Sequence, residues 1–432
     1  MTFRGKISVL VLSGVLAIYA VVGGMLSPWT QAQQPINDST AQMRIFESVL
    51  QHIQNDYVDE PNLEKVRYGA LRGLVGGLDP YSSYLTPEQV KEFGSKQPSN
   101  KVGIGAQLSQ VALYLYVVSV SKGSNAEKAG LKAGDVVEYV ENKATRDISL
   151  YDAKQLVLGD PGTSVSLRIL RASEKPQTIK VVRGEPKVPA VESKMEAGKI
   201  GLIKVFSLES GEANDIKTHI QNLTKQGAEK IVLDLRSVAT GTLEEGVAAA
   251  NLFIKNGDLA KVIGKDGVVK RTFSADPTKA VFDGKLAVLI DLGTAGAAEA
   301  IAAAVLDAKR GEVVGERTFG AGTEQQLFTL RGGDGLLLTT AKWASPSGKP
   351  FLGDDRATTG IKPSVEVKRP DTPAPLELNE LIDQQEEQKQ NPDVTPTPLP
   401  VKPVSKPSVL EDLQLKKALE ILQEKAQAAK VG

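Results

Sequence analysis

The sequence predicts an α/β fold class for most of the chain, with a helical region ahead of it and a smaller β-rich domain between the two. From residue 199 to 367, apolar runs such as GLIKV, KIVLDLR and KLAVLID alternate with segments of helical periodicity. Such alternation is typical of parallel sheets covered by helices. An apolar content of 41% over 432 residues also allows a sizeable core and more than one domain.

The helical region is expected from residue 41 to residue 95. Apolar residues recur there at near-helical spacing between residues 45 and 58. A Gly-Gly pair and an Asp-Pro pair near residue 78 interrupt the pattern. Thr86 followed by Pro87 then predicts the N-cap and first position of another short helix.

The β-rich domain is expected over residues 99–185. It combines a Gly-Ile-Gly-Ala strand opening at 103–106, an apolar strand LYVVSV, and the phrase AGLKAGD within residues 126–140. A helix is predicted at 150–158, and the strand SVSLRILR follows. Together these signatures resemble a PDZ domain, inserted between the helical region and the α/β core.

A PDZ resemblance implies a site for peptide tails. In a Gly-rich loop, successive backbone N–H groups are free to hold a terminal carboxylate, while the peptide adds as a strand beside a groove helix. An isolated pair of glycines would indicate only a turn, but here the second signature follows at the matching distance. The expected peptide-binding residues are Gly103, Ile104, Gly105, Ala106, Leu150 and Lys154.

The segment 286–325 holds the most informative motifs of the chain. A predicted strand runs into the turn GTAGAAE, and a second turn, TFGAG, follows at residues 318–322. With LDPYSSYL at 78–85 and DLQLKKAL at 412–419, these motifs resemble the carboxyl-terminal processing peptidases, or tail-specific proteases, which are Ser/Lys enzymes. The resemblance implies a ClpP/crotonase-like core that cleaves protein tails delivered by the PDZ domain.

The residues that the resemblance assigns to catalysis are missing. The nucleophilic Ser of the family falls on Gly296, and the basic Lys falls on Ala321. Gln325 matches the Gln that orients the Lys in some members, and Asp307 matches another polar position. The oxyanion segment also departs from the family, because Thr240 stands where the first of two glycines is expected. A β-branched residue is poorly suited to backbone angles that glycine permits.

Three functions remain open at this stage. The first is a catalytically inactive homologue that binds protein C-termini or extended peptides through the PDZ domain and the vacated cleft. Such a homologue could form a homo-oligomer or a hetero-oligomer with an active relative. The alternative is an active serine-type peptidase with relocated residues, for which Thr294 and Lys342 are the candidates; an N-cap or turn role for Thr294 and a surface role for Lys342 are the plainer interpretations. The third is a structural envelope protein that assembles through its C-terminal helix.

Composition excludes several other classes. Lys and Arg total 52, as do Asp and Glu, so nothing favours nucleic-acid binding. The absence of Cys removes disulfides and thiolate sites, and only His52 and His219 are present. Two histidines are too few for a multi-His metal centre and give little basis for a Ser-His-Asp triad. We therefore expect no metal or cofactor.

The two ends of the chain are expected to lie outside the folded core. Residues 1–32 contain basic Arg4 and Lys6 and an uncharged run at 7–26, which predicts a signal peptide or an uncleaved membrane anchor and an extracytoplasmic location. The expected division is then 33–98 helical region, 99–185 PDZ domain, 186–370 core, 371–408 Pro-rich linker and 409–432 terminal helix. A capping box of Ser408 and Glu411 is predicted to open that helix, whose apolar face docks on the same chain or on a second subunit.

Overall fold

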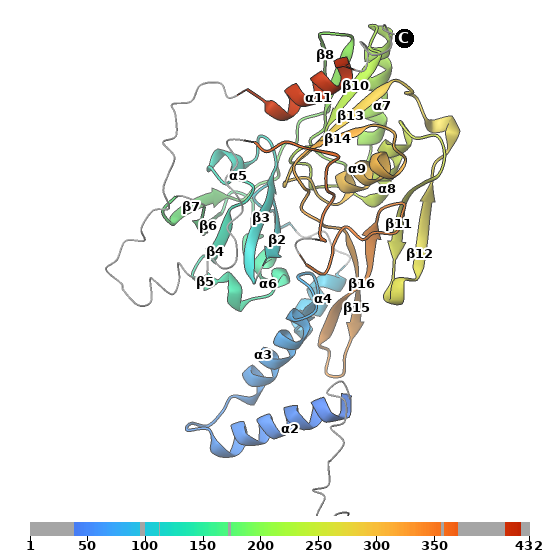
Figure 1. The fold of residues 1–432 in the computed structure, drawn as a ribbon. Helices are drawn as coiled ribbons and strands as arrows, with labels where there is room; N and C mark the ends of the chain where they lie inside the picture. The colour runs from blue at the N-terminus through green and yellow to red at the C-terminus, as the bar shows by residue number, and fades with distance from the viewer. Residues whose placement is uncertain are drawn as a thin grey trace, which may run out of the picture. The chain divides into compact units, whose positions relative to one another are not determined.

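The computed structural model describes residues 39–95, 100–111, 113–171, 174–355, 358–369 and 411–424 (Figure 1). The predicted signal or anchor at 7–26, the linker at 371–408 and Ser408 lie outside these residues. Within the described ranges, no helix has the length and apolar character needed to cross a bilayer. The chain divides into two compact units, Met1–Ala70 and Leu71–Gly432.

The predicted N-terminal helices are present. Helix α2 (Ser39–Asp56) belongs to the first unit and buries none of its side chains, and α3 (Leu63–Gly76) follows it. In the second unit, α4 (Pro87–Gly94) begins as predicted. The Thr86 hydroxyl accepts a hydrogen bond from the Gln89 N–H, and the Gln89 side chain accepts one from the Thr86 N–H. This reciprocal capping box satisfies two N–H groups that the helix itself cannot pair.

The α/β core is built on a six-stranded sheet in the order β17-β14-β13-β10-β9-β8. All neighbours are parallel except β8 and β9. The strands run over Val365–Glu366, Glu312–Gly315, Lys285–Ile290, Lys230–Asp234, Ile200–Lys204 and Glu192–Glu196, in sheet order. The central residues of β10 and all residues of β13 after Lys285 are apolar, as expected for strands whose two faces are both covered.

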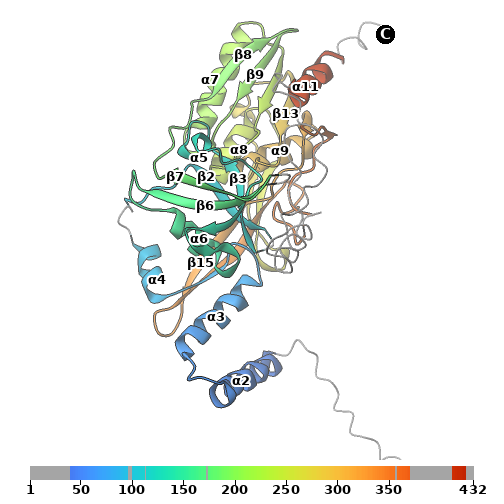
Figure 2. The ribbon, with the colours of Figure 1, turned by 90° about the vertical axis from the view of Figure 1, so that its left-hand side faces the viewer.

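Helices cover the two faces of this sheet from opposite sides (Figure 2). Ile231 and Leu233 of β10 join a cluster with apolar residues of α7 (Glu212–Lys225), α8 (Leu243–Asn251) and α9 (Ala297–Asp307). Val232, between them, points to the other face, where α11 (Leu413–Glu424) contributes Ala418 and Leu422. The period of two along a strand therefore separates the two layers.

A second sheet of five strands flanks the core. Its order is β1-β16-β11-β12, with β15 also paired to β16, and every pairing is antiparallel. The strands run over Ser83–Leu85, Gly335–Ala344, Asp258–Ile263 and Val269–Ser274, and β15 over Thr323–Thr329. Short 3-10 turns occur at Thr145–Asp147, Lys265–Gly267 and Pro277–Lys279.

The β-rich domain forms a third sheet in the order β2-β3-β4-β6-β7, with β5 paired to β4. Strand β2 (Ala106–Val111) is an edge strand beside helix α6 (Leu150–Val157). The observed limits of α6 are close to the predicted 150–158. The remaining elements are β3 (Tyr114–Val120), α5 (Asn125–Lys128), β4 (Val136–Val140), β5 (Lys143–Ala144), β6 (Ser164–Leu170) and β7 (Gln177–Val182).

The C-terminal helix docks on the same chain, and its first turn differs from the prediction. Helix α11 begins at Leu413, and the Asp412 carboxylate accepts a hydrogen bond from the Leu415 N–H at 3.0 Å. Asp412 thus occupies the capping role predicted for Ser408 and Glu411. Leu415, Ala418, Leu419 and Leu422 share one face, as predicted, and pack on the core sheet.

Candidate active site

The turn between β13 and α9 has the geometry of a nucleophile elbow. Gly296 stands directly before α9 with φ 61° and ψ −114°, which an L side chain adopts only under strain. A Cβ added to Gly296 would have its nearest neighbour, Trp343 Cζ3, at 3.6 Å. The position is therefore open to a side chain, and glycine supplies none.

The second turn places Ala321 between two glycines at positive φ, Gly320 and Gly322, before β15 begins. Glu299, from the first turn of α9, joins the two turns. Its carboxylate accepts hydrogen bonds from the N–H groups of Gly296, Gly320 and Ala321, each at 2.8 Å, and from the Thr318 hydroxyl. Glu299 lies 21 residues before Gly320, so no local sequence pattern indicates this connection.

Burial dominates the electrostatics of this carboxyl group. Glu299 is fully buried, and burial raises its pKa to about 7 although four hydrogen-bond donors act in the opposite direction. A single titratable group thus connects the turn at Gly296, where a nucleophile was expected, to the turn at Ala321, where a base was expected.

Trp343 fills the space beside both turns. Besides its approach to Gly296, its ring lies 2.8 Å from a Cβ built on Gly322. Successive side chains of a strand point to opposite faces, so Lys342 faces away from Trp343. Its ammonium lies 3.5 Å from Asp354 Oδ1. The structure therefore gives no support for Lys342 as a replacement base.

Thr294 is committed to the turn. Its side chain is completely buried, and its hydroxyl lies 3.0 Å from the Leu235 carbonyl and 3.1 Å from Asp291 Oδ1 while accepting a bond from the Asp291 N–H. Lysine does not occur among these partners within the described part of the chain. Asp307 likewise has a structural contact, because its carboxylate accepts a hydrogen bond from the Ser347 N–H.

The oxyanion segment corrects one expectation. Thr240 does not take a positive φ; the left-handed positions are Ser237, at 63°, and Gly241, at 137°. A Cβ on Gly241 would lie 2.2 Å from the Leu208 carbonyl oxygen, so the close approach that demands glycine falls at 241. Thr240 therefore fits its site without strain of this kind.

Gln325 lies on the exposed side of β15. Its side-chain amide donates to the Thr323 hydroxyl at 2.6 Å and to the Thr339 hydroxyl at 3.3 Å. In the absence of a lysine at position 321, these threonines take up its hydrogen-bonding capacity.

The PDZ-like sheet packs against both turns. Tyr114, Tyr116 and Val118 of β3 form an apolar cluster with the core, and Tyr116 stacks on Phe319 with ring centroids 5.7 Å apart. The core side of this cluster consists of Ala239, Leu292, Ala295, Phe319 and Ala321. The methyl group at the base position is thus part of an apolar contact between the two domains.

The expected peptide-binding residues lie together at the edge of the PDZ-like sheet. The carbonyls of Gly103, Ile104 and Gly105 accept hydrogen bonds from the N–H groups of Gly184, Ala126 and Ser121. Their own N–H groups donate no hydrogen bond to any described residue. Ala106 begins β2, and Leu150 and Lys154 lie on α6 beside it.

Tyr81, in the LDPYSSYL motif, connects this edge to the core. Its hydroxyl accepts a hydrogen bond from the Ser109 hydroxyl of β2 at 3.2 Å. The preceding Asp79 accepts from the Tyr81 N–H and from Thr339 of β16. The sequence indicated no role for Tyr81, since the contact joins residues far apart in the chain.

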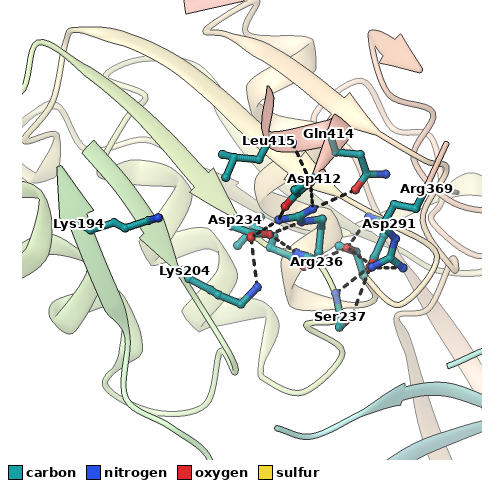
Figure 3. A network of polar contacts seen from close by, with 12 residues as sticks. Lys194, Lys204, Asp234, Arg236, Ser237, Asp291, Arg369, Asp412, Gln414 and Leu415 are labelled. Carbon is teal, nitrogen blue, oxygen red and sulfur yellow. Dashed lines mark hydrogen bonds and ion pairs between the residues drawn. The ribbon is translucent and has the colours of Figure 1, made fainter. Parts of the chain in front are cut away.

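A polar network ties α11 to the end of β10 (Figure 3). The Arg236 guanidinium donates to both carboxylate oxygens of Asp412, each at 2.8 Å, and also pairs with Asp234. Burial raises the pKa of Asp234 but Arg236 lowers it, and the net shift is downward. Next to it, Ser237 donates to Asp291, which pairs with Arg369 at 3.1 Å. The oxyanion segment is therefore held by the C-terminal helix.

Comparison with known proteins agrees with this architecture. The model of Peptidase family S41 matches residues 199–367, and a PDZ domain model matches residues 116–171. A "Probable CtpA-like serine protease" of Staphylococcus aureus strain MRSA252 is 34% identical over 342 residues, which are 78% of this chain and 67% of that protein. Its counterpart in strain bovine RF122 / ET3-1 is 33% identical over 85% of this chain and 73% of that protein.

A solved structure shares the fold. The photosystem II D1 C-terminal processing protease superposes with a TM-score of 0.62 at 26% sequence identity, over 76% of this chain and 93% of that one. The predicted combination of helical region, PDZ domain and α/β peptidase core is thus confirmed as a fold, while the domain boundaries and the roles of individual site residues stay predictions.

Proposed function

The chain belongs to peptidase family S41, and we propose that it binds protein C-terminal tails without cleaving them. The observation that carries the proposal is the pair of turns joined by Glu299. They keep the backbone that a Ser/Lys peptidase needs and offer a hydrogen atom at Gly296 and a methyl group at Ala321. Acyl transfer requires an oxygen nucleophile and a base that is neutral when it takes the proton.

The residue at position 321 supports the same conclusion, because its methyl group cannot accept a proton although its surroundings would desolvate an amine. The base of this mechanism must be a desolvated amine, and here the corresponding place is part of the apolar cluster with Tyr116 and Phe319. Loss of one member of a catalytic pair removes most turnover, because the two act as a unit. Both members are missing in this chain.

Binding is supported by the edge of the PDZ domain. Three consecutive N–H groups before β2 have no partner among the described residues, and β2 has one unpaired edge. A peptide can place its carboxylate on the first feature and extend along the second. The structurally similar D1 C-terminal processing protease is, by its name, an enzyme that acts at a protein C-terminus.

Hydrolysis by relocated residues is the weaker candidate. The buried Thr294 hydroxyl has hydrogen-bond partners in Leu235 and Asp291, and the Lys342 ammonium is paired with Asp354. Neither group has a free partner for general-base catalysis. We also propose an extracytoplasmic location, with residues 7–26 as signal or anchor, and partners that are unfolded or extended protein tails.

The test pairs a binding assay with a cleavage assay on the full chain. A fluorescent peptide with a free carboxyl terminus is expected to bind, its amidated form to bind poorly, and mass spectrometry to find both intact after long incubation. Hydrolysis that disappears in Thr294→Ala would overturn the proposal in favour of a relocated nucleophile. Equal binding of the free and amidated peptides would overturn the tail-binding part.

A further inference from the structure

The expected peptide groove lies between β2 and α6, and one of its ends is the loop 103–105. The other end opens into a pocket of about 270 Å³. Its wall includes Gln110 at the end of β2 and Ser149 and Leu150 at the start of α6. The opposite wall includes Arg72, close to the end of α3, and Asp79. The pocket therefore continues the line of the groove beyond the PDZ domain itself.

The two elements of the groove run in opposite directions. The last turn of α6 is held near the loop, since Gly159 and Val102 exchange two backbone hydrogen bonds and Leu158 lies 3.8 Å from a Cβ built on Gly103. The first turn of α6 lines the pocket instead. A peptide whose carboxylate sits at 103–105 must then extend along β2 toward the pocket, antiparallel to that strand.

Spacing sets which peptide residues meet which side chains. From Ala106 to Gln110, four steps of about 3.3 Å give roughly 13 Å, so the fifth residue from the end of the peptide reaches the pocket. Lys154 lies one helical turn nearer the loop than Leu150, about 6 Å or two peptide residues. It therefore faces the third residue from the end. The last, third-last and fifth-last side chains share one face of a strand.

The protein side chains expected beside the third-last and fifth-last peptide residues, Lys154 and Arg72, are both positively charged. Lys154 is partly buried on α6, and its ammonium has neither a hydrogen bond nor an ion pair with any described residue. Burial lowers its pKa, as expected for a cation without a partner. Arg72 also has no partner of either kind within the described ranges. The pocket contains a second guanidinium, Arg146, and one carboxylate, Asp79, which four donors already occupy.

We propose that this groove selects protein tails with an acidic side chain at the third and fifth positions from the C-terminus. Lys154 pairs with the first carboxylate and Arg72 with the second. The inference rests on the proposed function, because it names the class of tail that the same site binds.

The experiment measures the affinity of the full chain for four fluorescent peptides by anisotropy. The first has Glu at the third and fifth positions from its end, the second has Gln at both, and the third carries the same two Glu residues at the second and fourth positions. The fourth is the first with an amidated end. We expect the first to bind roughly tenfold more tightly than the second and third, about threefold for each ion pair. Salt should reduce this preference.

Substitutions test whether Lys154 and Arg72 cause the preference for Glu over Gln in the peptide. Lys154→Gln and Arg72→Gln are each expected to lower the ratio of the Glu to the Gln affinity about threefold. The matched control is Lys180→Gln, an equal change of charge on exposed β7 at the opposite edge of the sheet, which should leave the ratio unchanged. A ratio that neither substitution lowers would overturn the assignment.

The outcomes separate the two proposals. Equal binding of the first three peptides, with weak binding of the amidated one, would overturn the acidic selectivity and leave tail binding intact. Tight binding of the third peptide would show general charge attraction and would also overturn the inference. No difference between the free and amidated ends would overturn the proposed function, and the selectivity with it.

Discussion

The edge of the PDZ domain and the two turns of the α/β core differ in which functional groups are present. Around Gly103, Gly105 and β2, both the backbone and the free hydrogen-bonding groups that the proposed peptide site needs are present. Around Gly296 and Ala321, the backbone is present and the reactive groups are absent. A peptide site uses main-chain groups that any sequence supplies, whereas hydrolysis depends on two particular side chains. Two substitutions can therefore remove one function and leave the other.

The largest effect is expected from replacing the missing pair. Gly296→Ser combined with Ala321→Lys should raise hydrolysis of an unstructured protein on the order of 10³-fold above the unchanged chain. Gly296 has room for the hydroxyl, and the apolar cluster around Ala321 would lower the pKa of a lysine. Each single substitution is the control and should remain inactive. A folded but inactive double variant would indicate that the segment from Arg236 to Thr242 is also deficient.

Glu299 provides the next largest effect, because it holds the core turns without any need for catalysis. Glu299→Ala leaves the buried N–H group of Gly320, the partly buried N–H groups of Gly296 and Ala321, and the Thr318 hydroxyl without their acceptor. We expect the free energy of unfolding in urea to fall by about 3–5 kcal/mol. Gln325→Ala, at an exposed site, should change it by less than about 0.5 kcal/mol. Similar values for both variants would contradict the structural role of Glu299.

The titration of Glu299 predicts an unusual pH dependence for the core. Its folded pKa of about 7 exceeds the unfolded value of 4.5, so between these values the folded chain holds a proton that the unfolded chain has lost. Stability from this group is thus present below pH 4.5 and decreases as the pH rises to 7, by about 3 kcal/mol. Unfolding in urea from pH 4.5 to 7.5 measures this decrease, and Glu299→Gln should remove it. A flat profile in the unchanged chain would contradict the raised pKa.

Local patterns predicted the elements that are confirmed here. The apolar runs predicted β10 and β13, and Thr86 with Pro87 predicted the start of α4. These signals arise within a few residues of each other. The turns around Gly296 and Ala321 were predicted in the same way, by motifs that are continuous in the chain.

Contacts between distant residues were beyond such patterns. The pairing of β1 with β16 joins Ser83 to Leu337, and Tyr81 meets Ser109 across the domain boundary. The cap of α11 was assigned to Ser408 and Glu411 because a capping box matched there, whereas the pairing of Asp412 with Arg236 favours a later start. Tertiary contacts, rather than local preference, decided each of these points.

The smallest effect distinguishes two glycines with positive φ, one in each region. Gly296→Ala adds backbone strain alone, since no atom lies within 3.6 Å of the new Cβ, and should cost about 1–2 kcal/mol. Gly105→Ala adds similar strain at φ 80° and also brings its Cβ to 2.3 Å from Ser124 Cβ, for a cost of about 3 kcal/mol. Urea unfolding of both variants measures the difference. If Gly296→Ala were the more costly change, there would be no space for a nucleophile beside Trp343. The core would then lack room for the reactive side chain in addition to lacking the side chain itself.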